Sequence, residues 1–124
     1  MEPIDLATTY LHLEPGSGLN VVPVDDRFWS TIDDRPALHT GRLVTASEMT
    51  ADWETWEMHP DGDEVILVAG GAVRIHTDPG GEAVTVSEPH LVVMPAGTWH
   101  TMDVVEPARV ITITWGAGTR HRPR

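Results

Sequence analysis

Short apolar stretches separated by turn residues make up most of this chain. From residue 37 onward these stretches are rich in Val, Ile, Thr and Trp, which favour pleated, half-buried backbone. The predicted strands cover residues 38–48, 53–59, 64–69, 72–77, 82–87, 90–94, 99–103 and 109–115. Turn residues, among them the pair Gly70-Gly71, lie between them. No interval has room for a crossover helix, so the pattern predicts an all-β, antiparallel sandwich or barrel.

The two ends of the chain have a different pattern. Residues 1–36 are expected to form an N-terminal arm, with a short helix over residues 5–13 and a helical turn over residues 25–29. The barrel is assigned to residues 37–116. Residues 117–124 are rich in Arg and are expected to form a flexible basic tail.

Composition narrows the chemistry that is available to the protein. The 124 residues suit a single domain. The chain has no Cys, so disulfides and thiolate metal sites are excluded, and a metal ion would need His, Asp or Glu ligands. Such ligands favour iron, manganese, nickel or zinc. All eight basic residues are Arg, so a Schiff-base mechanism on a lysine is excluded as well.

The net charge of −11 limits the partners that the protein can bind. It opposes contact with nucleic acid phosphates and with anionic membrane surfaces. The N-terminal residues show neither the basic nor the apolar region of a signal peptide, and the longest apolar run, residues 65–69, is too short to span a membrane. These features predict a cytoplasmic protein.

Two carboxylates and two histidines are placed so that they can converge. Glu57 and His59 lie two residues apart on a predicted strand and therefore share a face. The turn over residues 60–63 should reverse the chain and bring Glu64 towards that face, whereas His100 follows a later turn over residues 95–98. Ionised carboxylates are costly inside an apolar barrel unless they are paired or bound to metal. The four residues therefore predict a metal site with open positions for a small molecule.

The same residues carry a resemblance to the cupins. The first cupin motif has His-x-His, three or four residues, Glu, six residues and Gly, and this chain has Glu57-Met58-His59, then Glu64 and Gly71. The second contains Pro-x-Gly-x-x-His, which matches residues 95–100. The chain resembles the family over roughly residues 37–115. The resemblance implies a jelly-roll, double-stranded β-helix barrel in which His59, Glu64 and His100 bind a divalent metal ion.

Glu57 stands where the family has its first His. It is a fourth metal ligand, a catalytic base that does not touch the metal, or a solvated or hydrogen-bonded carboxylate. Trp53 lies an even number of residues from Glu57 and Met102 lies two residues from His100, so each shares a strand face with a predicted site residue. Both are therefore candidates to line the pocket. Plain core packing is the alternative for Trp53. Asp63 is interpreted as a turn residue. The other histidines lack this spacing and are expected to be structural or exposed; they are His12, His39, His76, His90 and His121.

Fold does not fix function, so two hypotheses remain. The first is a metal-dependent enzyme acting on a small molecule, of dioxygenase type with iron or of isomerase or lyase type with zinc or manganese. The second is a non-catalytic small-molecule-binding or sensor module. In addition, side chains alternate between the two faces of a strand, so four apolar residues should point away from the predicted ligands: Trp56, Met58, Val65 and Leu67. Apolar surface of this kind is unusual on a monomer and predicts a homodimer.

Overall fold

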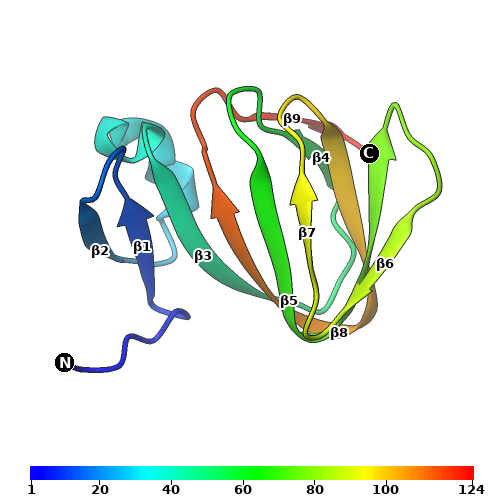
Figure 1. Cartoon of the computed structure of the whole chain (residues 1–124), viewed down its shortest axis with the longest axis horizontal. Coiled ribbons are helices and arrows are strands. Elements are labelled where there is room, and N and C mark those ends of the chain that lie inside the picture. Colours follow the sequence, from blue (N-terminus) through cyan, green and yellow to red (C-terminus); the bar gives the residue numbers. More distant parts are fainter.

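The computed structural model describes residues 1–124 as an antiparallel, jelly-roll-like barrel with little helix (Figure 1). Its strands are β1 (Thr9–Leu13), β2 (Leu19–Pro23), β3 (Arg42–Met49), β4 (Thr55–Met58), β5 (Glu64–Asp78), β6 (Val84–Ser87), β7 (Leu91–Met94), β8 (Trp99–Thr114) and β9 (Arg120–Pro123). Two short 3₁₀ helices, η1 (Trp29–Asp34) and η2 (Pro36–His39), connect β2 to β3. The predicted all-β jelly roll is confirmed.

The long strands β5 and β8 run through both layers of the barrel. Their paired halves 64–68 and 110–113 lie in a first layer, ordered β2-β1-β3-β8-β5-β7. Their other halves, 72–78 and 99–106, lie in a second layer, ordered β9-β4-β8-β5-β6. Side chains between the layers form the main core, which includes Ile66, Val68, Val110 and Met102.

Gly70-Gly71 is a bend within one strand, and the predicted turn at this position is wrong. The pairing of β5 with β8 shifts register between Val68 and Ala72, where β5 passes from one layer to the other. Gly71 has φ +70°, and a Cβ there would lie 2.1 Å from the carbonyl oxygen of Pro107. Only glycine tolerates both conditions, so the residue type that suggested a turn serves to bend a strand.

The N-terminal arm extends the first layer. The predicted helix over residues 5–13 is wrong, because residues 9–13 form β1, which pairs with β2 and β3. Burial alternates along β1, with Tyr10 and His12 inside and their neighbours half-buried. Tyr10, Phe28 and Leu43 form a second small core under this arm. The helical turn predicted before Pro36 is present as η1, shifted to Trp29–Asp34.

The C-terminal residues are also ordered, so the prediction of a flexible tail is wrong. Residues 120–123 form β9, which pairs with β4 along its whole length. The guanidinium of Arg122 forms an ion pair with Asp78 and lies over the ring of Trp99, 4.4 Å from its centroid. Arg124 forms an ion pair with Asp103. The basic tail is therefore held by the acidic body of the same chain. Neither 3₁₀ helix is long and apolar enough to cross a membrane.

Candidate metal centre

Three strands place the predicted ligands at one end of the barrel. His59 directly follows β4, Glu64 opens β5, and His100 is the second residue of β8. The strands β4 and β8 pair at Glu57 and His100, which sets the two sequence motifs side by side. The turn before β8 is also joined to the end of β4, because the backbone N–H of Gly97 donates to the carbonyl oxygen of His59 at 2.8 Å.

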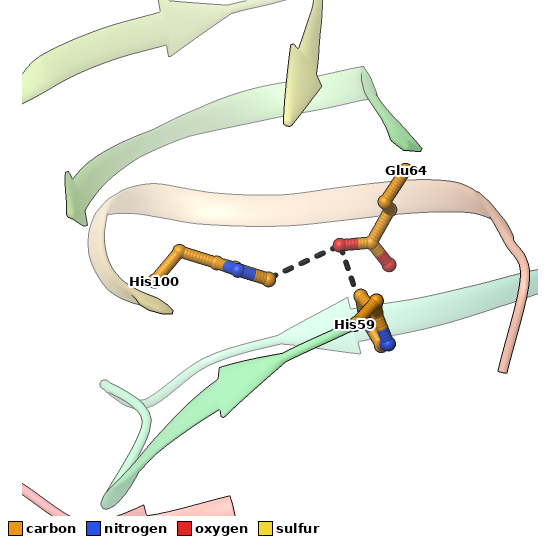
Figure 2. A group of neighbouring side chains, drawn as sticks. All are labelled: His59, Glu64 and His100. Carbon is orange, nitrogen blue, oxygen red and sulfur yellow. Dashed lines mark ion pairs between the residues drawn. The ribbon is translucent and has the colours of Figure 1, made fainter. Parts of the chain in front are cut away.

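Two imidazoles, those of His59 and His100, converge on one carboxylate oxygen of Glu64 (Figure 2). Oε2 of Glu64 lies 3.4 Å from Nε2 of His59 and 3.1 Å from Nε2 of His100. The potential ligand atoms of the three residues all lie within 4.8 Å of one another. No more than 5% of any of these side chains is exposed. The interior position and the convergence agree with the prediction for these three residues.

The converging atoms have no hydrogen bonds of acceptable geometry. Nε2 of His59, Oε2 of Glu64 and Nε2 of His100 are all buried and lack a hydrogen-bond partner, although each lies within 3.4 Å of another polar atom of the site. Leaving one buried polar atom unsatisfied costs about 1–3 kcal/mol, and three together are rare in a native fold. A divalent cation satisfies all three at once, and two imidazoles with one carboxylate are a donor set suited to transition metals. The residues therefore fit a metal ion.

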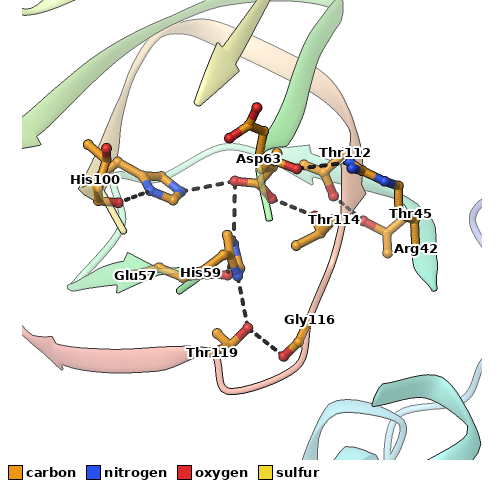
Figure 3. Close-up of polar contacts among 12 residues, drawn as sticks. Arg42, Thr45, Glu57, His59, Asp63, His100, Thr112, Thr114, Gly116 and Thr119 are labelled. Atoms are coloured by element: carbon orange, nitrogen blue, oxygen red, sulfur yellow. Dashed lines mark hydrogen bonds and ion pairs between the residues drawn. The ribbon is translucent and has the colours of Figure 1, made fainter. Parts of the chain in front are cut away.

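The outer atoms of two ligands are held by neighbouring groups (Figure 3). Nδ1 of His100 lies 3.2 Å from the carbonyl oxygen of Thr98, which only accepts, so Nδ1 carries the proton and Nε2 presents its lone pair inward. The hydroxyl of Thr114 donates to Oε1 of Glu64 at 2.6 Å, which leaves Oε2 to face the histidines. Such hydrogen bonds orient ligands before a metal arrives.

The charges in the site are strongly coupled. Burial alone would lower the pKa of His59, but the adjacent Glu57 and Glu64 carboxylates, 3.0 and 3.4 Å from its Nε2, raise it to about 9. Burial alone would raise the pKa of Glu64, but contacts with His100, His59 and Thr114 lower it to about 2. Near neutral pH the metal-free protein therefore holds a buried imidazolium beside a carboxylate, and a metal ion must displace that proton.

Comparison with known proteins places this architecture in a family. A family model described as "Cupin" matches residues 36–123. The chain belongs to the cupin family. A search of the curated proteins finds no match.

Several solved structures have the same fold at low identity. A cupin-2 domain containing protein from Shewanella frigidimarina has a TM-score of 0.52 at 22% identity, covering 67% of this chain and 71% of that chain. A variant of PAC13 from Streptomyces, solved with uridine, has a TM-score of 0.57 at 15% identity, covering 66% and 68%. Hydroquinone 1,2-dioxygenase from Sphingomonas, solved with 4-hydroxybenzoate, has a TM-score of 0.50 at 13% identity, covering 59% of each chain. At these identities the likeness shows the fold alone.

Glu57, which replaces the first histidine of the cupin motif, lies at the edge of the centre. Its Oε1 is 3.0 Å from Nε2 of His59, and its side chain is 23% exposed. It does not belong to the group of three whose ligand atoms all lie close together. Its other oxygen, Oε2, is 3.5 Å from Nε2 of His121. The chain therefore brings a second carboxylate to the rim of the site.

The two predicted pocket residues have different surroundings. Trp53 is half-buried, and its ring centroid lies 6.1 Å from that of His100. Met102 is 1% exposed and belongs to the main core cluster. Asp63 holds a loop together, as a turn residue should, because its Oδ1 accepts from the N–H of Ala96 at 2.9 Å.

Sequence interpretation missed the residues that the C-terminal segment brings to this cupin site. His121 pairs with Glu57 across β9 and β4, and the hydroxyl of Thr119 lies 2.8 Å from Nδ1 of His59. Neither residue belongs to a motif. The residues 120–123 are Arg, His, Arg and Pro, which carry no apolar alternation that would predict a strand.

Proposed function

We propose that this cupin is a metal-dependent enzyme acting on a small molecule, with His59, Glu64 and His100 as metal ligands. The observation that carries the proposal is the set of three buried atoms that face one another without hydrogen bonds. Iron, manganese, nickel and zinc all suit these ligands. Two histidines and one carboxylate are also the donor set of non-haem iron oxygenases, which favours a reaction of dioxygenase type over isomerase or lyase chemistry.

When bound, the metal supplies a Lewis acid for a substrate oxygen or, as iron, a redox centre. The residues of the chain supply the rest. Thr114 and Thr98 hold Glu64 and His100 in place. Trp53 packs against the main core beside His100, where it would line one side of the site. The similar structures solved with 4-hydroxybenzoate or uridine support a small molecule as the ligand.

Glu57 has two possible roles in this proposal. As a fourth ligand it would add a second oxygen donor to the site. As a base it would remain unbound at the rim, where its partial exposure lets it exchange a proton with a substrate. Its contact with His121 favours the second role, because one of its two oxygens is turned away from the centre.

Metal analysis tests the main proposal. Protein purified without chelator should contain close to one metal ion per chain by elemental mass spectrometry. The double variant His59→Ala/His100→Ala should contain none. Wild-type protein that takes up no iron, manganese, nickel or zinc, even after incubation with these ions, would defeat the proposal.

A non-catalytic binding or sensor module is the second candidate function. The close burial of all three ligands favours it, because a closed site can hold a metal without admitting a substrate. Nitric oxide binding to the iron-loaded protein, followed by electron paramagnetic resonance, separates the two. An enzyme with open metal positions gives the nitrosyl signal, whereas a closed site does not.

The outer face of the first layer supports the predicted homodimer. One continuous row of aliphatic side chains crosses it in register: Val21, Leu11, Val44, Ile113, Val65 and Val93. At about 4.8 Å per strand the row is roughly 24 Å wide. It contains no charge, so in a chain of net charge −11 it is a face where two copies can approach with little repulsion.

The apolar residues that first suggested a dimer lie on two different faces. Val65 and Leu67 lie in the first layer, on the aliphatic face. Met58 is 8% exposed, and Trp56 is half-buried beneath the guanidinium of Arg122 in the second layer. Neither of these two needs a partner chain. We therefore assign the interface to the first layer alone, with a second copy of this chain as its occupant.

A further inference from the structure

The outer nitrogen of His59 is held by the C-terminal segment of the chain. Nδ1 of His59 lies 2.8 Å from Oγ1 of Thr119, which precedes β9 (Figure 3). The hydroxyl of Thr119 in turn donates to the carbonyl oxygen of Gly116 at 2.8 Å. These contacts form a short relay from a backbone carbonyl, through one hydroxyl, to a ligand of the candidate metal centre.

The relay determines which nitrogen of His59 carries a proton. A threonine hydroxyl has a single hydrogen, and a carbonyl oxygen can only accept. Since that hydrogen goes to Gly116, the hydroxyl must accept from Nδ1–H of His59. In the neutral ring the proton then lies on Nδ1, and the lone pair of Nε2 faces Glu57, Glu64 and His100.

We propose that Thr119 is a positioning residue that selects the metal-binding tautomer and ring orientation of His59. This inference rests on the proposed metal centre and adds the C-terminal segment to it. His100 obtains the same tautomer from a backbone carbonyl, that of Thr98, which no substitution can remove. His59 instead depends on one replaceable side chain.

The position of Thr119 is itself fixed by the fold. Its backbone N–H donates to the same Gly116 carbonyl at 3.2 Å, which closes a tight turn. The pairing of β9 with β4 and the ion pair between Arg122 and Asp78 hold the strand that follows. The ordered tail therefore links the end of the chain to the geometry of the site.

Three variants test the role of Thr119 through metal affinity. Thr119→Val keeps the shape but removes the hydroxyl, Thr119→Ser keeps the hydroxyl, and Thr85→Val makes the same change at an exposed position on β6. Zinc affinity is measured by competition with a chromophoric chelator, and the fold is checked by circular dichroism. Loss of an outer hydrogen bond to a ligand typically weakens metal binding about 10–100-fold, and we expect this for Thr119→Val. Thr119→Ser and Thr85→Val should bind zinc as wild type does.

A second measurement reads the tautomer without any metal. Long-range ¹⁵N–¹H correlation spectra of the metal-free protein, recorded where His59 is neutral, should show the proton on Nδ1 in wild type and on Nε2 or both nitrogens in Thr119→Val. A proton on Nε2 in wild type, or unchanged zinc affinity in Thr119→Val, would overturn the inference. If wild type binds no metal, the proposed function fails, and the spectra still decide the role of Thr119.

Discussion

Oε2 of Glu64 lies 3.4 Å from Nε2 of His59, with both side chains buried in the barrel. Against the effect of burial, the Glu57 and Glu64 carboxylates raise the pKa of His59 from 6.5 to about 9. Contacts with His100, His59 and Thr114 lower the pKa of Glu64 from 4.5 to about 2, also against the effect of burial. A raised histidine pKa stabilises the fold fully below pH 6.5, and this contribution is lost as the pH rises through 9. A lowered carboxyl pKa stabilises the fold above pH 4.5, and this contribution is lost as the pH falls towards 2.

The metal-free protein should therefore gain most from this pair between pH 4.5 and 6.5. Zinc must displace the proton of His59, so its affinity should rise about tenfold per pH unit from 6.5 and level off above 9. Thermal unfolding with and without zinc across this range checks both trends, with His59→Ala as the control. A zinc-induced shift in Tm that is constant between pH 6.5 and 9 would contradict the buried imidazolium.

Replacing Glu57 by Gln tests its position at the rim of the centre. The three inner ligands converge without it, so Glu57→Gln should keep one metal per chain and lose much less zinc affinity than His59→Ala. The spectrum of the cobalt-loaded variant should match that of wild type, because the ligands are unchanged. A loss of affinity equal to that of His59→Ala would instead make Glu57 a primary ligand.

Gly71→Ala should destabilise the barrel at the bend of β5. The residue needs a positive φ, and its new Cβ would lie 2.1 Å from the carbonyl oxygen of Pro107. Strain and clash of this kind cost roughly 2–4 kcal/mol of unfolding free energy. Urea unfolding measures the loss. Gly81→Ala is the matched control, since no atom lies within 4 Å of its added Cβ, and it should change stability by less than about 0.5 kcal/mol. Equal stability of the two variants would contradict the role of Gly71.

Local sequence rules predicted that His59, Glu64 and His100 converge, and their role as metal ligands stays a prediction. Alternation along a strand put Glu57 and His59 on the same face. The short turns at residues 60–63 and 95–98 put Glu64 at the start of β5 and His100 near the start of β8. What could not be predicted depends on pairing between distant segments. The tail looked like a solvated basic end because its partner, β4, lies some sixty residues earlier in the chain. Thr119 and His121 reach the site only through that pairing.

The sequence of residues 5–13 was expected to form a helix because both faces of the strand β1 carry apolar side chains. On β1, Tyr10 and His12 face the interior while Leu11 and Leu13 lie half-buried on the outer face. Apolar residues on both sides, with a buried histidine among them, erase the alternation that marks a half-exposed strand. His12 is accommodated there because its Nε2 lies 2.6 Å from the carbonyl oxygen of Thr40.

The aliphatic face of the first layer predicts the oligomeric state. Val93 ends the row and is 56% exposed, so Val93→Glu should leave the fold intact and place a charge at the interface between two copies. Light scattering coupled to gel filtration should give twice 13.6 kDa for wild type and 13.6 kDa for the variant. Val84→Glu, on β6 in the second layer and 54% exposed, adds the same charge elsewhere and should remain dimeric. Because each copy carries a charge of −11, added salt should strengthen the wild-type dimer by screening the repulsion. A monomeric wild type at all concentrations, or a Val93→Glu variant as dimeric as Val84→Glu, would remove this face as the interface.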